Sequence, residues 1–218
     1  MIVMKPLALT LLALTTVRFA FATDYLFAPN DRQTSGGGVG FFGPLANAPR
    51  TYQLIINANQ LTGFVGRNLN GFTFRQISTS TAAWPSAPVT YGNYDIYLSS
   101  SVAPSARSLT FAANIVGSQL QVRSGPLTIS SHSFPILGTN FSFGTDIAFS
   151  NYLYLGGNLL IEIRHTGSGG TNTAVDSVAS SGGTGYGSQV SACWQSGYTA
   201  TSGSPGNFAV TRLRALDV

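Results

Sequence analysis

The chain has 218 residues, of which 44% are hydrophobic and only 8% are charged, and it contains 25 glycines, 10 prolines and one cysteine. This composition excludes a disulfide-stapled miniprotein, a coiled coil and a metal domain held by cysteines. The formal net charge is +4, but the arginines are scattered singly apart from Arg212 and Arg214, so we expect no nucleic-acid partner.

The first 22 residues predict a secretory signal peptide. Met1–Lys5 form a short basic region, residues 6–17 form an apolar stretch, and Ala20–Ala22 supply the small residues that signal peptidase requires. Arg18 ends the apolar stretch short of the roughly 20 residues that a membrane span needs. We therefore expect export, cleavage before Thr23, no integral membrane span in the mature chain, and a secreted, extracellular or cell-surface location.

The next segment, residues 23–49, is expected to form an N-terminal arm and first loop, because it carries a Ser-Gly-Gly-Gly run. Residues 50–218 show a period of two, with short runs rich in β-branched and aromatic residues between Gly, Pro, Asn and Ser. These runs are Tyr52–Ala58, Gly71–Ile77, Tyr94–Leu98, Ser108–Ala112, Gln119–Val122, Pro126–Ile129, Asp146–Phe149 and Leu159–Ile163.

Residues 166–206 are rich in Gly, Ser and Thr, but a structureless loop of that length is unusual inside a domain. We expect two weaker strands there, Ala174–Ala179 and Gly187–Trp194, followed by a last strand over Asn207–Leu216. Because no window beyond the signal peptide has an apolar helical stripe, the sequence predicts an all-β fold. The predicted architecture is a single antiparallel β-sandwich, jelly-roll-like, of roughly nine to twelve strands.

Alternation in the run Leu159–Ile163 predicts which side chains face the core. Leu159, Ile161 and Ile163 should point inward, and Glu162 and Arg164 outward as an exposed ion pair. Glu162 is also the strongest candidate for a catalytic acid, with Asp95 as the second carboxyl that a glycosidase needs. The exposed ion pair is the simpler interpretation.

Other catalytic groups find little support in the sequence. Cys193 is predicted to be a small buried strand residue, and His132 and His165 are the only bases available to a serine nucleophile. Zinc would need three or four His or Cys ligands. Asp24, Asn30 and Asp31 could bind calcium, although solvated loop side chains are the simpler interpretation. We therefore expect no catalytic residue, metal or cofactor.

Three tyrosines suggest a binding surface. Tyr97, Tyr152 and Tyr154 alternate with apolar neighbours, so if those neighbours face the core the tyrosines face outward. An outward aromatic row can stack on sugar rings, and tyrosine is equally typical of protein interfaces. We therefore predict these three residues as ligand-binding or subunit-contact residues.

The succession of strands resembles a known group of proteins. The segments that carry this resemblance, within residues 50–165, are Gly71–Arg75, Tyr94–Ser100, Leu109–Asn114 and Gly157–Arg164. They are similar to uncharacterised secreted bacterial β-sandwich proteins, many of which carry a C-terminal PEP-CTERM sorting tail. The chain departs from the group in ending Arg214-Ala215-Leu216-Asp217-Val218, without such a tail. The resemblance implies export and a sandwich fold, and it implies no activity.

Two classes of function follow from these observations. The first is a secreted, non-catalytic structural or adhesive protein of the bacterial cell surface or extracellular matrix, acting through self-association and strand edges. The alternative is a carbohydrate-binding module that holds polysaccharide on its outward tyrosines. A glycoside hydrolase is a distant third.

Overall fold

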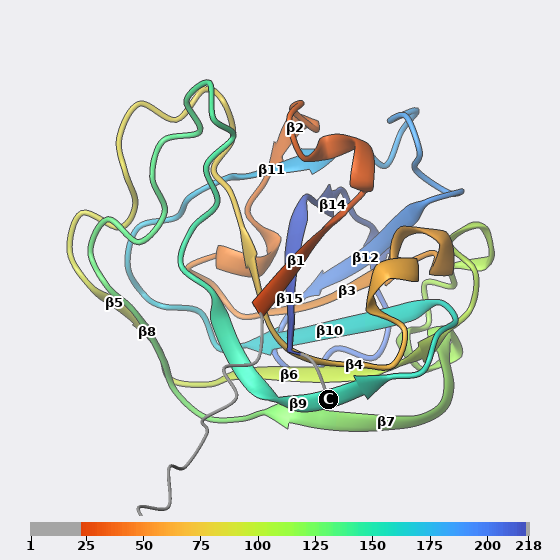
Figure 1. The fold of residues 1–218 in the computed structure, drawn as a ribbon. Helices are drawn as coiled ribbons and strands as arrows, with labels where there is room; N and C mark the ends of the chain where they lie inside the picture. Colours follow the sequence, from red (N-terminus) through yellow and green to blue (C-terminus); the bar gives the residue numbers. More distant parts are fainter. Residues whose placement is uncertain (1–22, 217–218) are drawn as a thin grey trace, which may run out of the picture.

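The computed structural model describes residues 23–216, so the predicted signal peptide lies outside the described residues. The regular structure of these residues consists of fifteen β-strands and six single-turn 3-10 helices (Figure 1). This confirms the all-β prediction. No helix in the described part of the chain is long and apolar enough to cross a membrane.

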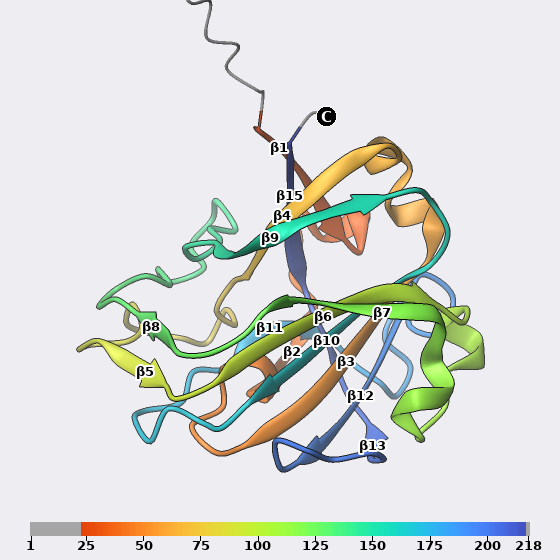
Figure 2. The ribbon, with the colours of Figure 1, turned by 90° about the horizontal axis from the view of Figure 1, so that it is seen from below.

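Two antiparallel sheets form the layers of a β-sandwich. The four-stranded sheet has the order β1-β15-β4-β9, and the six-stranded sheet has the order β13-β12-β3-β10-β6-β7 (Figures 1 and 2). The first sheet comprises Thr23–Ala28 (β1), Thr211–Leu216 (β15), Arg67–Phe74 (β4) and Ile147–Tyr154 (β9). The second comprises Ser204–Pro205 (β13), Val190–Ser196 (β12), Arg50–Ile56 (β3), Leu159–His165 (β10), Tyr94–Ser101 (β6) and Ile115–Arg123 (β7).

Smaller elements close the ends of the sandwich. A three-stranded sheet consists of Phe208–Ala209 (β14), Val175–Val178 (β11) and Gly38–Phe41 (β2), and a two-stranded sheet consists of Val89–Tyr91 (β5) and Leu127–Ile129 (β8). The 3-10 helices are Asn30–Arg32 (η1), Gly43–Leu45 (η2), Ala58–Gln60 (η3), Thr62–Phe64 (η4), Pro104–Ala106 (η5) and Phe111–Asn114 (η6).

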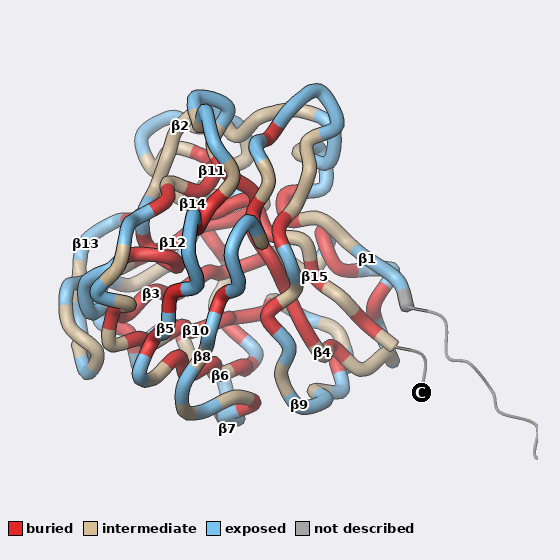
Figure 3. The backbone as a smooth tube through the Cα atoms, turned by 90° about the vertical axis from the view of Figure 1, so that its left-hand side faces the viewer, coloured by how far each residue is buried: buried red, intermediate tan, exposed pale blue. Residues whose placement is uncertain are grey.

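One hydrophobic core fills the space between the two large sheets, and Figure 3 shows the buried backbone concentrated there. Leu159, Ile161 and Ile163 of β10 point into it, as their alternation predicts. Phe72 of β4 and Leu213 of β15 face them from the other sheet. Fully burying a side chain of this size contributes about 1.5–3 kcal/mol, so the core holds the fold without a disulfide.

The described residues form fifteen strands, more than the roughly nine to twelve predicted, and the structure also differs from the sequence prediction in three segments. Residues 23–49 contain strand β1 of the four-stranded sheet, paired with β15, and strand β2 of the three-stranded sheet, paired with β11, instead of an arm. Ser108–Ala112, predicted as a strand, leads into η6. The predicted last strand divides at Val210, whose N–H donates to the Asp176 carbonyl oxygen at 2.9 Å. On one side of this residue β14 pairs with β11, and on the other β15 pairs with β1 and β4.

Candidate functional site

The outward face of the six-stranded sheet carries a row of polar side chains across its central strands. The register sets Glu162 of β10 between Gln53 of β3 and Tyr97 of β6, and sets Arg164 of β10 opposite Asp95 of β6. The two carboxyls singled out from the sequence, Glu162 and Asp95, therefore lie on neighbouring strands of the same face.

Glu162 is buried, which corrects the predicted exposed ion pair. Its side chain is about 1% exposed, and its Oε2 accepts a hydrogen bond from Gln53 Nε2 at 2.6 Å. Its Oε1 accepts a hydrogen bond from Arg164 Nε at 2.5 Å. Helix η6 covers this part of the sheet, because Gln53 Nε2 also donates to the carbonyl oxygen of Phe111 at 3.2 Å. Glu162 thus fixes the direction of the partly exposed Arg164 side chain.

Arg164 in turn lies over an aromatic ring. Its Cζ is 5.5 Å from the ring centroid of Tyr97, within the range of a cation-π contact. Tyr97 points outward as predicted, because its neighbours Ile96 and Leu98 are fully buried in the core. Partial burial raises the pKa of the Tyr97 hydroxyl, and the Asp95 carboxylate raises it further.

Asp95 orients a second tyrosine on the same face. Its Oδ1 accepts a hydrogen bond from Gly125 N at 3.0 Å, and its Oδ2 accepts one from the Tyr198 hydroxyl. The hydrogen bond to Asp95, with a smaller contribution from burial, raises the pKa of Tyr198 to about 12. Thr51 Oγ1 donates to the carbonyl oxygens of Gly197 and Tyr198 at 2.9 and 3.1 Å, which fixes the loop that carries the ring.

We call Tyr97, Arg164 and Tyr198 the tyrosine platform. Tyr97 and Asp95 lie two residues apart on one face of β6, about 7 Å along the strand, so the Tyr198 hydroxyl bound to Asp95 stands beside Tyr97. All three side chains are partly exposed, and Glu162 and Asp95 beneath them are buried. The result is an aromatic surface with one cation, in which Glu162 holds Arg164 and Asp95 holds Tyr198 from below.

Tyr152 and Tyr154 do not belong to this surface, and their predicted outward direction is wrong. Tyr154 is 2% exposed and lies in the core, while Leu153 and Leu155 are 46% and 77% exposed. Tyr152 pairs with the buried Leu69 of β4 and packs partly against the core. Burial raises the pKa of the Tyr152 hydroxyl and raises that of Tyr154 to about 12.

The remaining nucleophile and base candidates are engaged in the interior or isolated at the surface. Cys193 is buried, as predicted, and burial raises the pKa of its thiol to about 12. Burial lowers the pKa of His165 to about 4. Its Nε2 donates to the Gly43 carbonyl oxygen at 3.0 Å, and its Nδ1 accepts from Gly167 N at 3.1 Å. His132 is exposed. Within residues 23–216, no three His, Cys, Asp or Glu side chains come together.

Sequence reasoning found Tyr97 but not Tyr198. Tyr198 lies in a Gly/Ser/Thr-rich connection after β12, where no strand period marks its direction. An isolated aromatic residue in such a segment is the one signal that could have indicated it. Compared with protein-family models, with curated proteins and with solved structures, the chain matches none of them.

Proposed function

We propose that the mature chain is a secreted, non-catalytic adhesive protein of the bacterial cell surface or extracellular matrix that holds polysaccharide on the tyrosine platform. The observation that supports this proposal is the fixed arrangement of Tyr97, Arg164 and Tyr198 on a rigid sheet face. Aromatic rings stack against the C–H faces of sugars, and the arginine and phenol groups can hydrogen-bond to their hydroxyls. Because Glu162 and Asp95 already orient these groups, little side-chain entropy is lost on binding.

The same geometry favours binding over hydrolysis. A glycosidase presents two carboxyl groups to the bond that it cleaves. Here both oxygens of Glu162 accept hydrogen bonds from Gln53 and Arg164, and both oxygens of Asp95 accept hydrogen bonds from Gly125 and Tyr198. These carboxylates serve as positioning groups for the platform.

The test is the migration of the mature protein through native gels that contain dextran, alginate or soluble cellulose derivatives. Each stacked ring contributes on the order of 1 kcal/mol, so the double variant Tyr97→Ala/Tyr198→Ala should bind about thirtyfold more weakly. Phe42→Ala is the control, because Phe42 is an exposed aromatic residue that lies outside the platform and outside the six-stranded sheet. Equal retardation of the double variant and the wild type in every gel would overturn the proposal.

Self-association is the second candidate, favoured by the edge of the sandwich onto which Figure 2 looks. Strands β7 and β9 are edge strands of their sheets there. Strand β9 contains no charged residue or proline, and in β7 the last residue, Arg123, is the only one of these types. Val116 and Leu120 of β7 and Leu153 of β9 are about half exposed. Bulges interrupt the pairing of both strands with their inner neighbours, which shortens the regular edge, so we rank this function second. Sedimentation that increases with protein concentration without sugar, and that Leu120→Lys abolishes, would favour it.

A further inference from the structure

A cavity of about 260 Å³ lies on the other side of the molecule from the platform's sheet, between two loops. One loop joins β1 to β2 and contributes Gln33 and Thr34, and the other precedes β9 and contributes residues 140–143. The strand residues Phe27 of β1 and Arg212 of β15 complete the walls. Drug-sized ligands occupy roughly 300–1,000 Å³, so this cavity suits one small ring.

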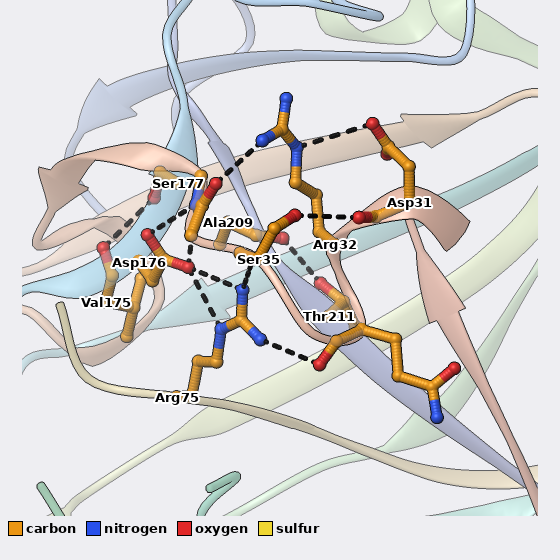
Figure 4. Close-up of polar contacts among 12 residues, drawn as sticks. Asp31, Arg32, Ser35, Arg75, Val175, Asp176, Ser177, Ala209 and Thr211 are labelled. Atoms are coloured by element: carbon orange, nitrogen blue, oxygen red, sulfur yellow. Dashed lines mark hydrogen bonds and ion pairs between the residues drawn. The ribbon is translucent and has the colours of Figure 1, made fainter. Parts of the chain in front are cut away.

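A single buried cation holds both loops in place. The Arg75 guanidinium donates to Asp176 Oδ2 from Nε at 2.9 Å and from Nη2 at 2.8 Å (Figure 4). Its Nη2 also donates to the Ser35 carbonyl oxygen at 2.5 Å, and its Nη1 to the Gln33 carbonyl oxygen at 3.4 Å. Gly37 N donates to both Asp176 carboxylate oxygens at 2.9 Å, which fixes the first loop a second time.

The second loop packs on the same guanidinium. Arg75 Cζ lies 5.1 Å from the ring centroids of both Phe141 and Phe143. Phe141 has a φ of 48°, a left-handed conformation that is uncommon for a residue with a side chain and that often occurs at functional sites. Because Arg75 is fully buried, the two walls of the cavity are fixed before any ligand arrives.

Apart from Arg212, the residues that line the cavity are aromatic or neutral polar. Phe27 and Phe143 lie with their ring centroids 5.4 Å apart, and Phe141 continues this apolar side. Gln33, Thr34 and Ser142 line the cavity, and their side chains make no hydrogen bond within residues 23–216. Hydroxyl and amide groups both donate and accept, which is the chemistry that recognises the hydroxyl groups of a sugar.

The charge at the rim is positive. Arg212 and Arg214 share one carboxylate, that of Asp146, at 2.9 and 3.3 Å. Asp176 already compensates Arg75, so the pair of Arg212 and Arg214 carries one net positive charge against the single carboxylate of Asp146. A planar guanidinium at such a position favours a carboxylate ligand.

We propose that this cavity is a second binding site, independent of the tyrosine platform, for a single sugar ring that bears a carboxylate, a hexuronate. The C–H face of the ring packs on Phe141 and Phe143, the hydroxyl groups meet Gln33, Thr34 and Ser142, and the carboxylate meets Arg212.

The test is a titration of the ¹⁵N-labelled mature protein with sodium D-glucuronate, with D-glucose as the probe that lacks only the carboxylate. We expect saturable amide shifts in residues 33–36 and 139–143, and a Kd for D-glucose at least about tenfold higher, equivalent to about 1.4 kcal/mol. Shifts confined to Tyr97 and Tyr198 would overturn this inference and leave the proposed function standing. Equal affinities for the two sugars would also overturn it.

Two variants locate the site by opposite means. Phe141→Ala removes one wall and should raise the Kd about fivefold, while Phe42→Ala, an exposed phenylalanine outside the cavity, should leave it unchanged. Ser142→Trp fills the cavity and should abolish the shifts of residues 33–36 even if Phe141→Ala fails to fold. Unchanged glucuronate binding by Ser142→Trp would place the ligand elsewhere.

Discussion

Replacement of Asp176 by asparagine tests how much the buried ion pair between Arg75 and Asp176 contributes to stability. The substitution keeps the shape of the side chain but removes its charge, while Arg75 remains fully buried on the opposite side. Asp176 accepts two hydrogen bonds from Arg75 and the N–H of Gly37. Asparagine has one acceptor oxygen, so these donors cannot all be satisfied.

Breaking a buried ion pair from one side costs about 3–5 kcal/mol, because the remaining charge loses its compensation. For a domain of this length, 1 kcal/mol corresponds to about 2–4 °C, so the melting temperature of Asp176→Asn should fall by about 6–20 °C. Position 37 requires glycine for this contact, because a Cβ there would lie 2.5 Å from the Ser177 carbonyl carbon.

Thermal denaturation of the mature protein followed by tryptophan fluorescence measures the melting temperature, and urea denaturation measures the free energy of unfolding. Asp31→Asn is the matched control, since Asp31 is a half-exposed partner of Arg32 at 3.6 Å and should contribute at most about 1 kcal/mol. The double replacement Arg75→Met/Asp176→Leu removes both charges and should recover much of the stability. If Asp176→Asn and Asp31→Asn lower the free energy of unfolding by the same small amount, the ion pair between Arg75 and Asp176 does not stabilise the fold and this reasoning is wrong.

Three further predictions rest on other parts of the molecule. Protein recovered outside the cytoplasm should have the intact mass of a chain that begins at Thr23, and retention of residues 1–22 would contradict the predicted cleavage. The pKa of His165 is lowered to about 4 in the folded protein, from about 6.5 in the unfolded chain. Its contribution to the free energy of unfolding is therefore present above pH 6.5 and is lost as the pH falls toward 4. Between pH 7 and pH 4, denaturation should show that the wild type loses about 3 kcal/mol more of this free energy than His165→Gln does. Because Cys193 is buried and its thiol pKa is about 12, a thiol reagent at pH 8 should label the protein only after unfolding, and rapid labelling of the native protein would refute its placement.

The sequence predicted the fold class and much of the strand pattern, because alternation reports which face of a strand is buried. In β10, apolar residues alternate with polar ones, and Leu159, Ile161 and Ile163 all face the core. In β9, tyrosine alternates with leucine, and both side chains can pack in a core or at a surface. The direction of the β9 side chains is set by the pairing of Tyr152 with the buried Leu69. A local sequence pattern does not predict the register between strands that lie far apart in the sequence.

The platform could be predicted only in part for a similar reason. Tyr97 lies on a regular strand, so its outward direction follows from its neighbours Ile96 and Leu98. Tyr198 comes from a loop, and its hydrogen bond to Asp95 spans 103 positions of sequence. Glu162 was expected to be exposed because nothing local shows that helix η6 covers the sheet.

Strands β1 and β15 bring Thr23 and Leu216 to the same corner of the sandwich, where the two residues pair directly (Figure 2). Tension between these two residues would peel β1 from β15 one hydrogen bond at a time, because the loaded ends lie opposite each other. A pull on Leu216 along the axis of β15 would instead load the hydrogen bonds to β1 and to β4 together, because β15 lies between these two strands. The sandwich should therefore resist axial tension on β15 better than tension that separates Thr23 from Leu216.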